Sequence, residues 1–173
     1  MSETATSQET VAKEAIAGKF LTFSLGDEEY GVGILNVQEI IGRLPITRVP
    51  RVPEFIRGVI NLRGRVIPIV DLRLKLGMPP GEESREQCMI VVEVTGVQMG
   101  LMVDRVSEVV DIPAAEIEDA PSFGSGVTTE YLLGIAKTAG KVRLLLDIER
   151  VLEKSEVTAL QAVQAASSAE AES

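Results

Sequence analysis

Few residues of this chain are of the types that carry out covalent chemistry. Histidine is absent, which removes the commonest general base and metal ligand and any Ser-His or Cys-His nucleophile pair. The single cysteine, Cys88, opens an apolar stretch without a CxxC partner and is expected in the core. No GxxxxGK(S/T) motif occurs, and Gly31-Val32-Gly33 falls inside an expected strand rather than between a strand and a helix. The sequence therefore predicts no catalytic residue, no cofactor and no metal site.

Carboxylates are abundant, but their spacing does not indicate chemistry. The acidic clusters at 27–29, 82–83 and 116–119 lack the spacing of a calcium loop and are expected to be solvated turns. The formal charge of −9, without any Lys/Arg run, argues against binding to nucleic acid or to an anionic membrane surface. No apolar run is long enough to insert into a membrane, and no export signal is visible. We therefore expect a cytoplasmic protein that works through its surfaces.

An internal repeat determines how these surfaces are arranged. Residues 20–41 align without a gap with residues 89–110 at a constant shift of 69, and residues 55–76 align with residues 131–152 at a shift of 76. Each unit has about 60 residues, and a unit of that size buries too little surface to be stable alone. The two units are therefore expected to pack against each other.

The pattern of each unit predicts short strands separated by turn residues, which favours two small β-barrels in a mainly β fold. We expect a first lobe at about 19–83, a second lobe at about 84–147 and a C-terminal helix at about 148–164. The ends, 1–18 and 166–173, are poor in apolar residues and are expected to be disordered tails.

Two related strands differ in their pattern. In 141–146 the apolar residues alternate, which predicts Val142 inside and Lys141 and Arg143 outside. In 65–70 both faces are apolar, with Ile67 and Ile69 on one of them. Such a strand is either buried between the lobes or covered by a partner.

Several motifs together resemble the CheW family of bacterial chemotaxis coupling proteins. They are GDEEYG at 26–31, VQEI at 37–40, FIRGVINLRG at 55–64, PIVDLR at 68–73, VDRVSEV at 103–109 and EYLLG at 130–134. The resemblance covers roughly 19–160 and implies two SH3-like five-stranded barrels. It also implies a non-catalytic adaptor between the cytoplasmic tips of methyl-accepting chemoreceptors and the regulatory domain of the histidine kinase CheA. Such an adaptor would be monomeric alone, recruited to the inner face of the membrane, and built into rings within receptor arrays.

The resemblance also implies which residues contact the partners. Val37, Val106 and Val109 match family positions that face the cleft between the barrels, where a receptor tip would bind; a core role is the alternative for each. In the family the arginine matching Arg63 pairs with the glutamate matching Glu39. The remaining candidates are Gly58 for the receptor and, on geometric grounds, Ile67, Ile69, Gly134 and Lys141 for the kinase.

Three other functions remain open at this point. The chain resembles equally a scaffold of the same family in another receptor–kinase pathway, such as one controlling pili. A small-molecule sensor would need a roomy pocket in the inter-lobe cleft, for which only Arg63 and Glu39 offer polar groups. An enzyme using carboxylates alone is the least favoured, because no pair is singled out by position.

Overall fold

The computed structural model describes residues 18–81, 84–118, 131–138, 140–152 and 154–172. Strands dominate it, as expected for a mainly β fold. The strands are β1 (Gly18–Leu25), β2 (Glu28–Gly33), β3 (Val37–Gly42), β4 (Ile56–Leu62), β5 (Arg65–Asp71), β6 (Cys88–Val94), β7 (Val97–Val103), β8 (Arg105–Ile112), β9 (Ile117–Glu118), β10 (Leu132–Thr138) and β11 (Lys141–Leu146). The helical segments are η1 (Ile34–Asn36), α2 (Leu72–Lys75), η2 (Ala114–Glu116), α3 (Ile148–Val151) and α4 (Lys154–Glu172).

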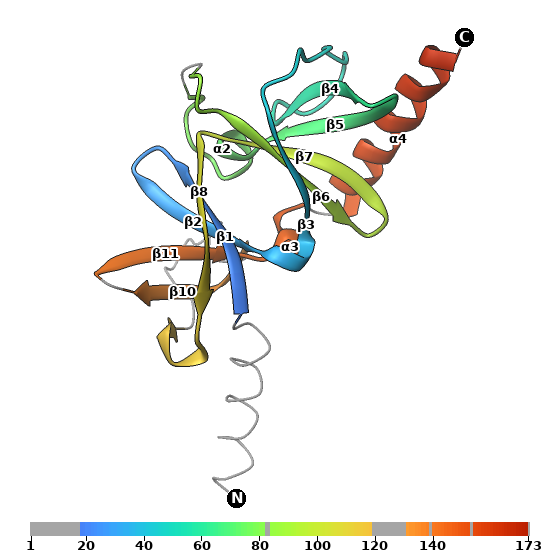
Figure 1. Cartoon of the computed structure of the whole chain (residues 1–173). Helices are drawn as coiled ribbons and strands as arrows, with labels where there is room; N and C mark the ends of the chain where they lie inside the picture. The colour runs from blue at the N-terminus through green and yellow to red at the C-terminus, as the bar shows by residue number, and fades with distance from the viewer. Residues whose placement is uncertain (1–17, 82–83, 119–130, 139, 153, 173) are drawn as a thin grey trace, which may run out of the picture.

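The strands form two curled sheets, one below the other in Figure 1. Barrel A has the strand order β8-β1-β2-β11-β10-β9, and barrel B has the order β3-β6-β7-β5-β4. In barrel A the edge strands β8 and β9 are joined directly by η2. In barrel B the chain leaving β3 returns to the other edge, where Thr47 exchanges two backbone hydrogen bonds with Val59 of β4. The two-lobed β architecture predicted from the repeat is confirmed.

Neither barrel is built from one repeat alone. The hairpin β1–β2 of the first repeat lies in barrel A among strands of the second, and the hairpin β6–β7 of the second repeat lies in barrel B among strands of the first. Parallel pairing joins the exchanged hairpins to their hosts, β2 to β11 and β7 to β5. The expected division into lobes at 83/84 therefore does not describe the sheets. The chain crosses between the barrels after β2 and again after β7.

This exchange explains why β6 is apolar on both faces. Along β6, Met89 and Val91 belong to the core of barrel B, whereas Ile90 and Val92 belong to a central cluster packed between the barrels. The central cluster also takes residues from β1, β7, α3 and α4. A separate cluster around Phe20 fills barrel A. Because apolar side chains occupy the space between the barrels, the inter-lobe cleft expected for a sensor is a packed core.

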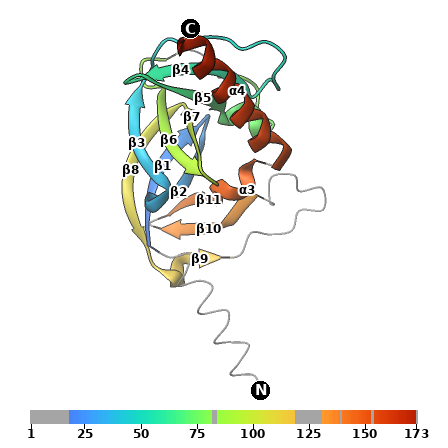
Figure 2. The same cartoon turned by 90° about the vertical axis from the view of Figure 1, so that its right-hand side faces the viewer.

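The C-terminal helical region is longer than expected and is broken. In place of one helix at 148–164, α3 ends at Val151 and α4 runs from Lys154 to Glu172, so most of the expected tail at 166–173 is helical. Helix α4 lies along β5 in both Figure 1 and Figure 2 and buries Leu160 and Val163. Of the expected N-terminal tail, residues 1–17 lie outside the described part of the chain. No described helix is long and apolar enough to cross a membrane.

Candidate functional site

The two edge strands β3 and β8 lie on the same side of the molecule, at the front of Figure 1 and the left of Figure 2. They occupy equivalent places in the two barrels and carry equivalent residues of the repeat. Among the described residues the exposed large apolar side chains are Leu35, Ile40, Val109 and Val142. The first three belong to β3, β8 or the turn just before β3, so exposed apolar surface gathers at these edges.

A β-bulge in each edge strand places two apolar residues, three positions apart, on one face. In β8, Val106 lies opposite Phe23 and Val109 lies opposite Leu21, with a register shift between the pairs. Because Leu21 and Phe23 share one face of β1, Val106 and Val109 share that face too. A regular strand would place residues three apart on opposite faces.

The bulge of β3 is the repeat-related copy. Val37 lies opposite Val92 and Ile40 lies opposite Ile90, again with a register shift between them. All four of their opposite residues in β1 and β6 belong to the central cluster. Val37, Ile40, Val106 and Val109 therefore form an apolar seam where the inter-barrel core reaches the surface.

The seam has a β3 half, Val37 and Ile40, and a β8 half, Val106 and Val109. Within each half the two side chains differ in exposure. Val37 and Val106 are half-buried and pack against the central cluster, so each lies partly in the core and partly at the surface. Ile40 and Val109 are 43% and 50% exposed, respectively. Ile40 was not among the residues predicted from the sequence, although the repeat shift of 69 pairs it with Val109.

The predicted pair of Arg63 and Glu39 is formed, and it lies beside the seam. Arg63 Nη1 donates a hydrogen bond to Glu39 Oε2 at 3.0 Å, and Nη2 pairs with Oε1. Glu39 lies opposite Val91, a residue of the barrel B core, so it is on the other face of β3 from Ile40. The guanidinium is held across the two open edges of barrel B, since β3 and the β4–β5 turn come from opposite ends of the sheet.

Gly58 has a backbone role in β4. It occupies a bulge with φ of +142°, and a Cβ added there would lie 2.1 Å from the carbonyl oxygen of Thr47. That carbonyl accepts the hydrogen bond from Val59 that joins the edges of barrel B. Any side chain at Gly58 would separate these edges, and the receptor contact expected for Gly58 would be indirect.

Three of the four residues expected to face the kinase are buried. Ile67 and Ile69 are both 0% exposed, because their face of β5 lines the interior of barrel B. The opposite face of β5 packs towards α4 and the central cluster. Gly134 is buried in β10, where a Cβ would lie 2.8 Å from the carbonyl oxygen of Glu118. These three residues do not present side chains to a partner.

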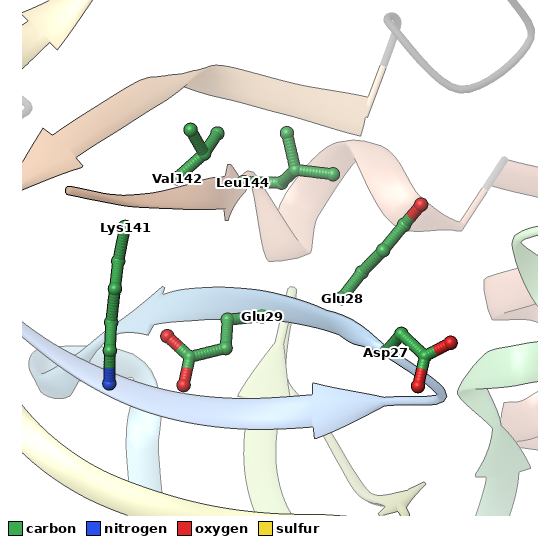
Figure 3. A pocket seen from close by; sticks show the side chains of 6 residues that line it. All are labelled: Asp27, Glu28, Glu29, Lys141, Val142 and Leu144. Atoms are coloured by element: carbon green, nitrogen blue, oxygen red, sulfur yellow. The ribbon is translucent and has the colours of Figure 1, made fainter.

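Lys141, the fourth, is exposed at the start of β11. It lines a cavity of about 490 Å³ between β11 and the β1–β2 turn, together with Asp27, Glu28, Glu29, Val142 and Leu144. In Figure 3, Lys141 and Glu29 extend to one side of the cavity, and Val142 and Leu144 to the other. The expectation that Val142 points inwards is wrong, since it is 55% exposed.

Arg143 is the main charged residue whose position the sequence did not predict. It was expected outside, but it is buried in barrel A, where its Nε lies 3.0 Å from Glu29 Oε2 and its Nη2 lies 4.0 Å from Glu108 Oε1. Glu29 therefore belongs to β2 and to an ion pair, not to a solvated turn. The equivalent residue in barrel B is Ile67, so the fold accommodates either an apolar or a charged residue there.

Within the part of the chain that the structure describes, no group of three or more His, Cys, Asp or Glu side chains is placed to hold a metal ion. Cys88 is half-buried at the edge of the central cluster. What the arrangement offers is an apolar seam with a fixed arginine beside it, which suits binding to another protein.

Comparison with known proteins agrees with this architecture. The family model of the CheW-like domain matches residues 19–156. The chain is 40% identical over 147 residues to chemotaxis protein CheW of Klebsiella aerogenes, covering 85% of this chain and 89% of that one. It is 33% identical over 138 residues to protein FrzA of Myxococcus xanthus, covering 78% and 85%.

A solved structure shows the same fold. The crystal structure of scaffolding protein TtCheW from Thermoanaerobacter tengcongensis matches with a TM-score of 0.74 at 37% identity, covering 81% of this chain and 95% of that chain. The motifs, the paired barrels and these comparisons show that the chain belongs to the CheW family.

Proposed function

We propose that this protein is an adaptor that couples the cytoplasmic tips of chemoreceptors to the histidine kinase CheA. The observation that carries the proposal is the apolar seam, in which two repeat-related strands present equivalent exposed side chains, Ile40 and Val109. Single exposed apolar residues are common on protein surfaces and need no explanation. Exposed apolar residues that gather at equivalent positions of two edge strands are typical of a surface that binds a partner.

The seam suits a helical partner. An amphipathic helix presents apolar residues every three or four positions, and the seam offers apolar side chains on two separate strands to receive them. Arg63, held by Glu39 beside the β3 half, supplies planar donors for a carboxylate or carbonyl of the partner. These features support assignment of the seam to the receptor tip.

The surface around Lys141 and Val142 is the proposed contact for the regulatory domain of CheA. It is exposed, it combines apolar and charged side chains, and it belongs to β11 and the β1–β2 turn rather than to the seam strands. A bridging protein needs two separate surfaces, so that both partners can bind at once. We propose that the protein acts in the cytoplasm at receptor arrays and that its role is structural rather than catalytic.

The test is a pair of matched substitutions, Val109→Asp and Val142→Asp. Both residues are valines on strands with about half of the side chain exposed, 50% and 55%. A charge in the seam should weaken binding to a receptor cytoplasmic fragment by about tenfold or more, because a buried contact would require desolvating the carboxylate. Binding to CheA should be retained in Val109→Asp and reduced in Val142→Asp.

Binding of each partner would be measured by isothermal titration calorimetry with purified proteins, and folding by circular dichroism. If Val109→Asp binds the receptor fragment as tightly as wild type, the seam is not the receptor site. Loss of both partners in a folded Val109→Asp variant would also contradict the proposal, because the two surfaces would then not be independent.

A further inference from the structure

The β8 half of the seam depends on a backbone irregularity that has to be stabilised. Two residues of β8, Ser107 and Glu108, lie opposite the single residue Thr22 of β1. A bulge of this kind leaves backbone donors and acceptors that the regular ladder does not satisfy. Without the bulge, Val106 and Val109 would face opposite sides of the strand.

The side chain of Thr22 satisfies both backbone groups of the bulged residue. Its Oγ1 donates a hydrogen bond to the carbonyl oxygen of Glu108 at 2.8 Å and accepts one from the Glu108 amide at 3.2 Å. Thr22 is fully buried, so water does not compete for its hydroxyl. The side chain of Glu108 is itself exposed, and its Oε1 lies 4.0 Å from Nη2 of the buried Arg143.

The second barrel shows that the fold does not demand this hydroxyl. Val91 occupies the position of Thr22 in the repeat and lies opposite the bulge of β3. There the extra residue, Gln38, is bonded through its side chain, which donates to Glu93 Oε2 at 2.8 Å and accepts from Gln98 Nε2 at 2.7 Å. These hydrogen bonds are exposed, so solvent and partners can compete with them.

We propose that Thr22 is a positioning residue that locks the β8 bulge and thereby presents Val106 and Val109 together as a preformed half of the seam. The β3 half, held by exposed side chains, is the adjustable one. This inference rests on the proposed function, because it assigns the locked half to receptor binding. Thr22 does not itself reach the partner, since it is buried beneath β8.

The test uses Thr22→Val, which keeps the shape and removes the hydroxyl, with Thr22→Ser as the variant that keeps the hydroxyl. Gln38→Ala is the matched control on the other bulge. Hydrogen exchange of the Glu108 amide reports the lock directly, and titration with a receptor cytoplasmic fragment reports its consequence. In Thr22→Val the Glu108 amide should exchange about tenfold faster and receptor affinity should fall by about tenfold, while CheA affinity stays unchanged.

Thr22→Ser should restore both readouts to within about twofold of wild type, and Gln38→Ala should leave Glu108 exchange unchanged. Equal losses in Thr22→Val and Thr22→Ser would assign the effect to packing of the methyl group and overturn the proposal. So would wild-type protein in which the Glu108 amide exchanges as fast as an exposed edge amide, a measurement that needs no variant. If Val109→Asp leaves receptor binding intact, the proposed receptor site fails, whereas the exchange data still decide whether Thr22 locks the bulge.

Discussion

Arg63 occupies a backbone position that a different residue would fill at lower cost. Arg63 and Gly64 form the two-residue turn between β4 and β5 with φ values of +54° and +84°, the geometry that favours Asn-Gly. An arginine in the left-handed region costs roughly 1 kcal/mol. Its ion pair with Glu39 returns little, about 0–1 kcal/mol, because the arginine side chain is 73% exposed. Stability therefore does not explain an arginine here, which favours a contact with a partner.

We predict that Arg63→Ala and Arg63→Asn both fold and both lose receptor-controlled kinase activity. Alanine pays the same backbone cost as arginine, so its melting temperature should stay close to wild type, and asparagine should raise it slightly. Thermal denaturation and a reconstituted receptor–kinase phosphorylation assay would measure the two effects. Arg65→Ala, at an exposed position two residues on, is the control. A large fall in melting temperature for Arg63→Ala would show that the arginine is a structural clip.

At the scale of the elements, helix α4 is held to barrel B by a buried ion pair as well as by apolar packing. Lys75 of α2 donates hydrogen bonds to both carboxylate oxygens of Glu156, at 2.7 and 2.6 Å, and the two side chains are only 9% and 14% exposed. The ammonium also lies 4.9 Å from the centroid of the Phe55 ring. Further along the helix, Gln164 donates to the carbonyl oxygen of Val66.

We predict that Lys75→Met destabilises the protein by about 1–3 kcal/mol, because it leaves the Glu156 carboxylate largely buried without its ammonium partner. Lys137→Met is the matched control: it removes a lysine whose ion pair with Glu118 is more than half exposed, and should change stability by less than about 1 kcal/mol. Urea denaturation followed by circular dichroism would compare them. Equal stability of the two variants would show that apolar packing alone holds α4.

At the scale of the whole molecule, a charged cluster joins the barrels where the chain crosses from β7 to β8. Asp104 pairs with Arg73 of α2 on the barrel B side and accepts a hydrogen bond at 2.8 Å from the amide of Gly26, in the β1–β2 turn of barrel A. The hydrogen bond from Arg73, followed by that from Gly26, holds the pKa of the Asp104 carboxyl below its ordinary value. The same pairing raises the pKa of Arg73.

We predict that this cluster makes stability fall in acid. An unfolded aspartate titrates at about pH 4, and the folded pKa of Asp104 is lower, so the stabilisation is present at neutral pH and is lost as the pH falls through the folded pKa. Asp104→Asn should reduce stability at neutral pH and flatten the loss in acid, as measured by urea denaturation across this range. Asp111→Asn, at an exposed position in β8, is the control. An unchanged acid profile in Asp104→Asn would assign the acid sensitivity to other groups.

Much of the architecture could be predicted from the residues because the pattern is local and occurs twice. The repeat shift of 69 residues aligns Val37 with Val106 and Ile40 with Val109. Pairing of Arg63 with Glu39 was implied by family resemblance, and their contact is formed. The two apolar faces of 65–70 left burial between the lobes and cover by a partner both open, and the structure buries Ile67 and Ile69 inside barrel B.

The sequence by itself determined that the chain has two related β units, a net negative charge and no histidine for chemistry. Only the tertiary structure decided which hairpin pairs with which unit, because equivalent strands have equivalent patterns and the parallel pairings β2–β11 and β5–β7 cross between repeats. It also decided that Arg143 is buried and that Val106 and Val109 share one face. The burial of Arg143 depends on its ion pair with Glu29 of the neighbouring strand β2. The shared face of Val106 and Val109 depends on the bulge opposite Thr22 of β1. The periodicity of a single strand predicts neither an ion pair nor a bulge.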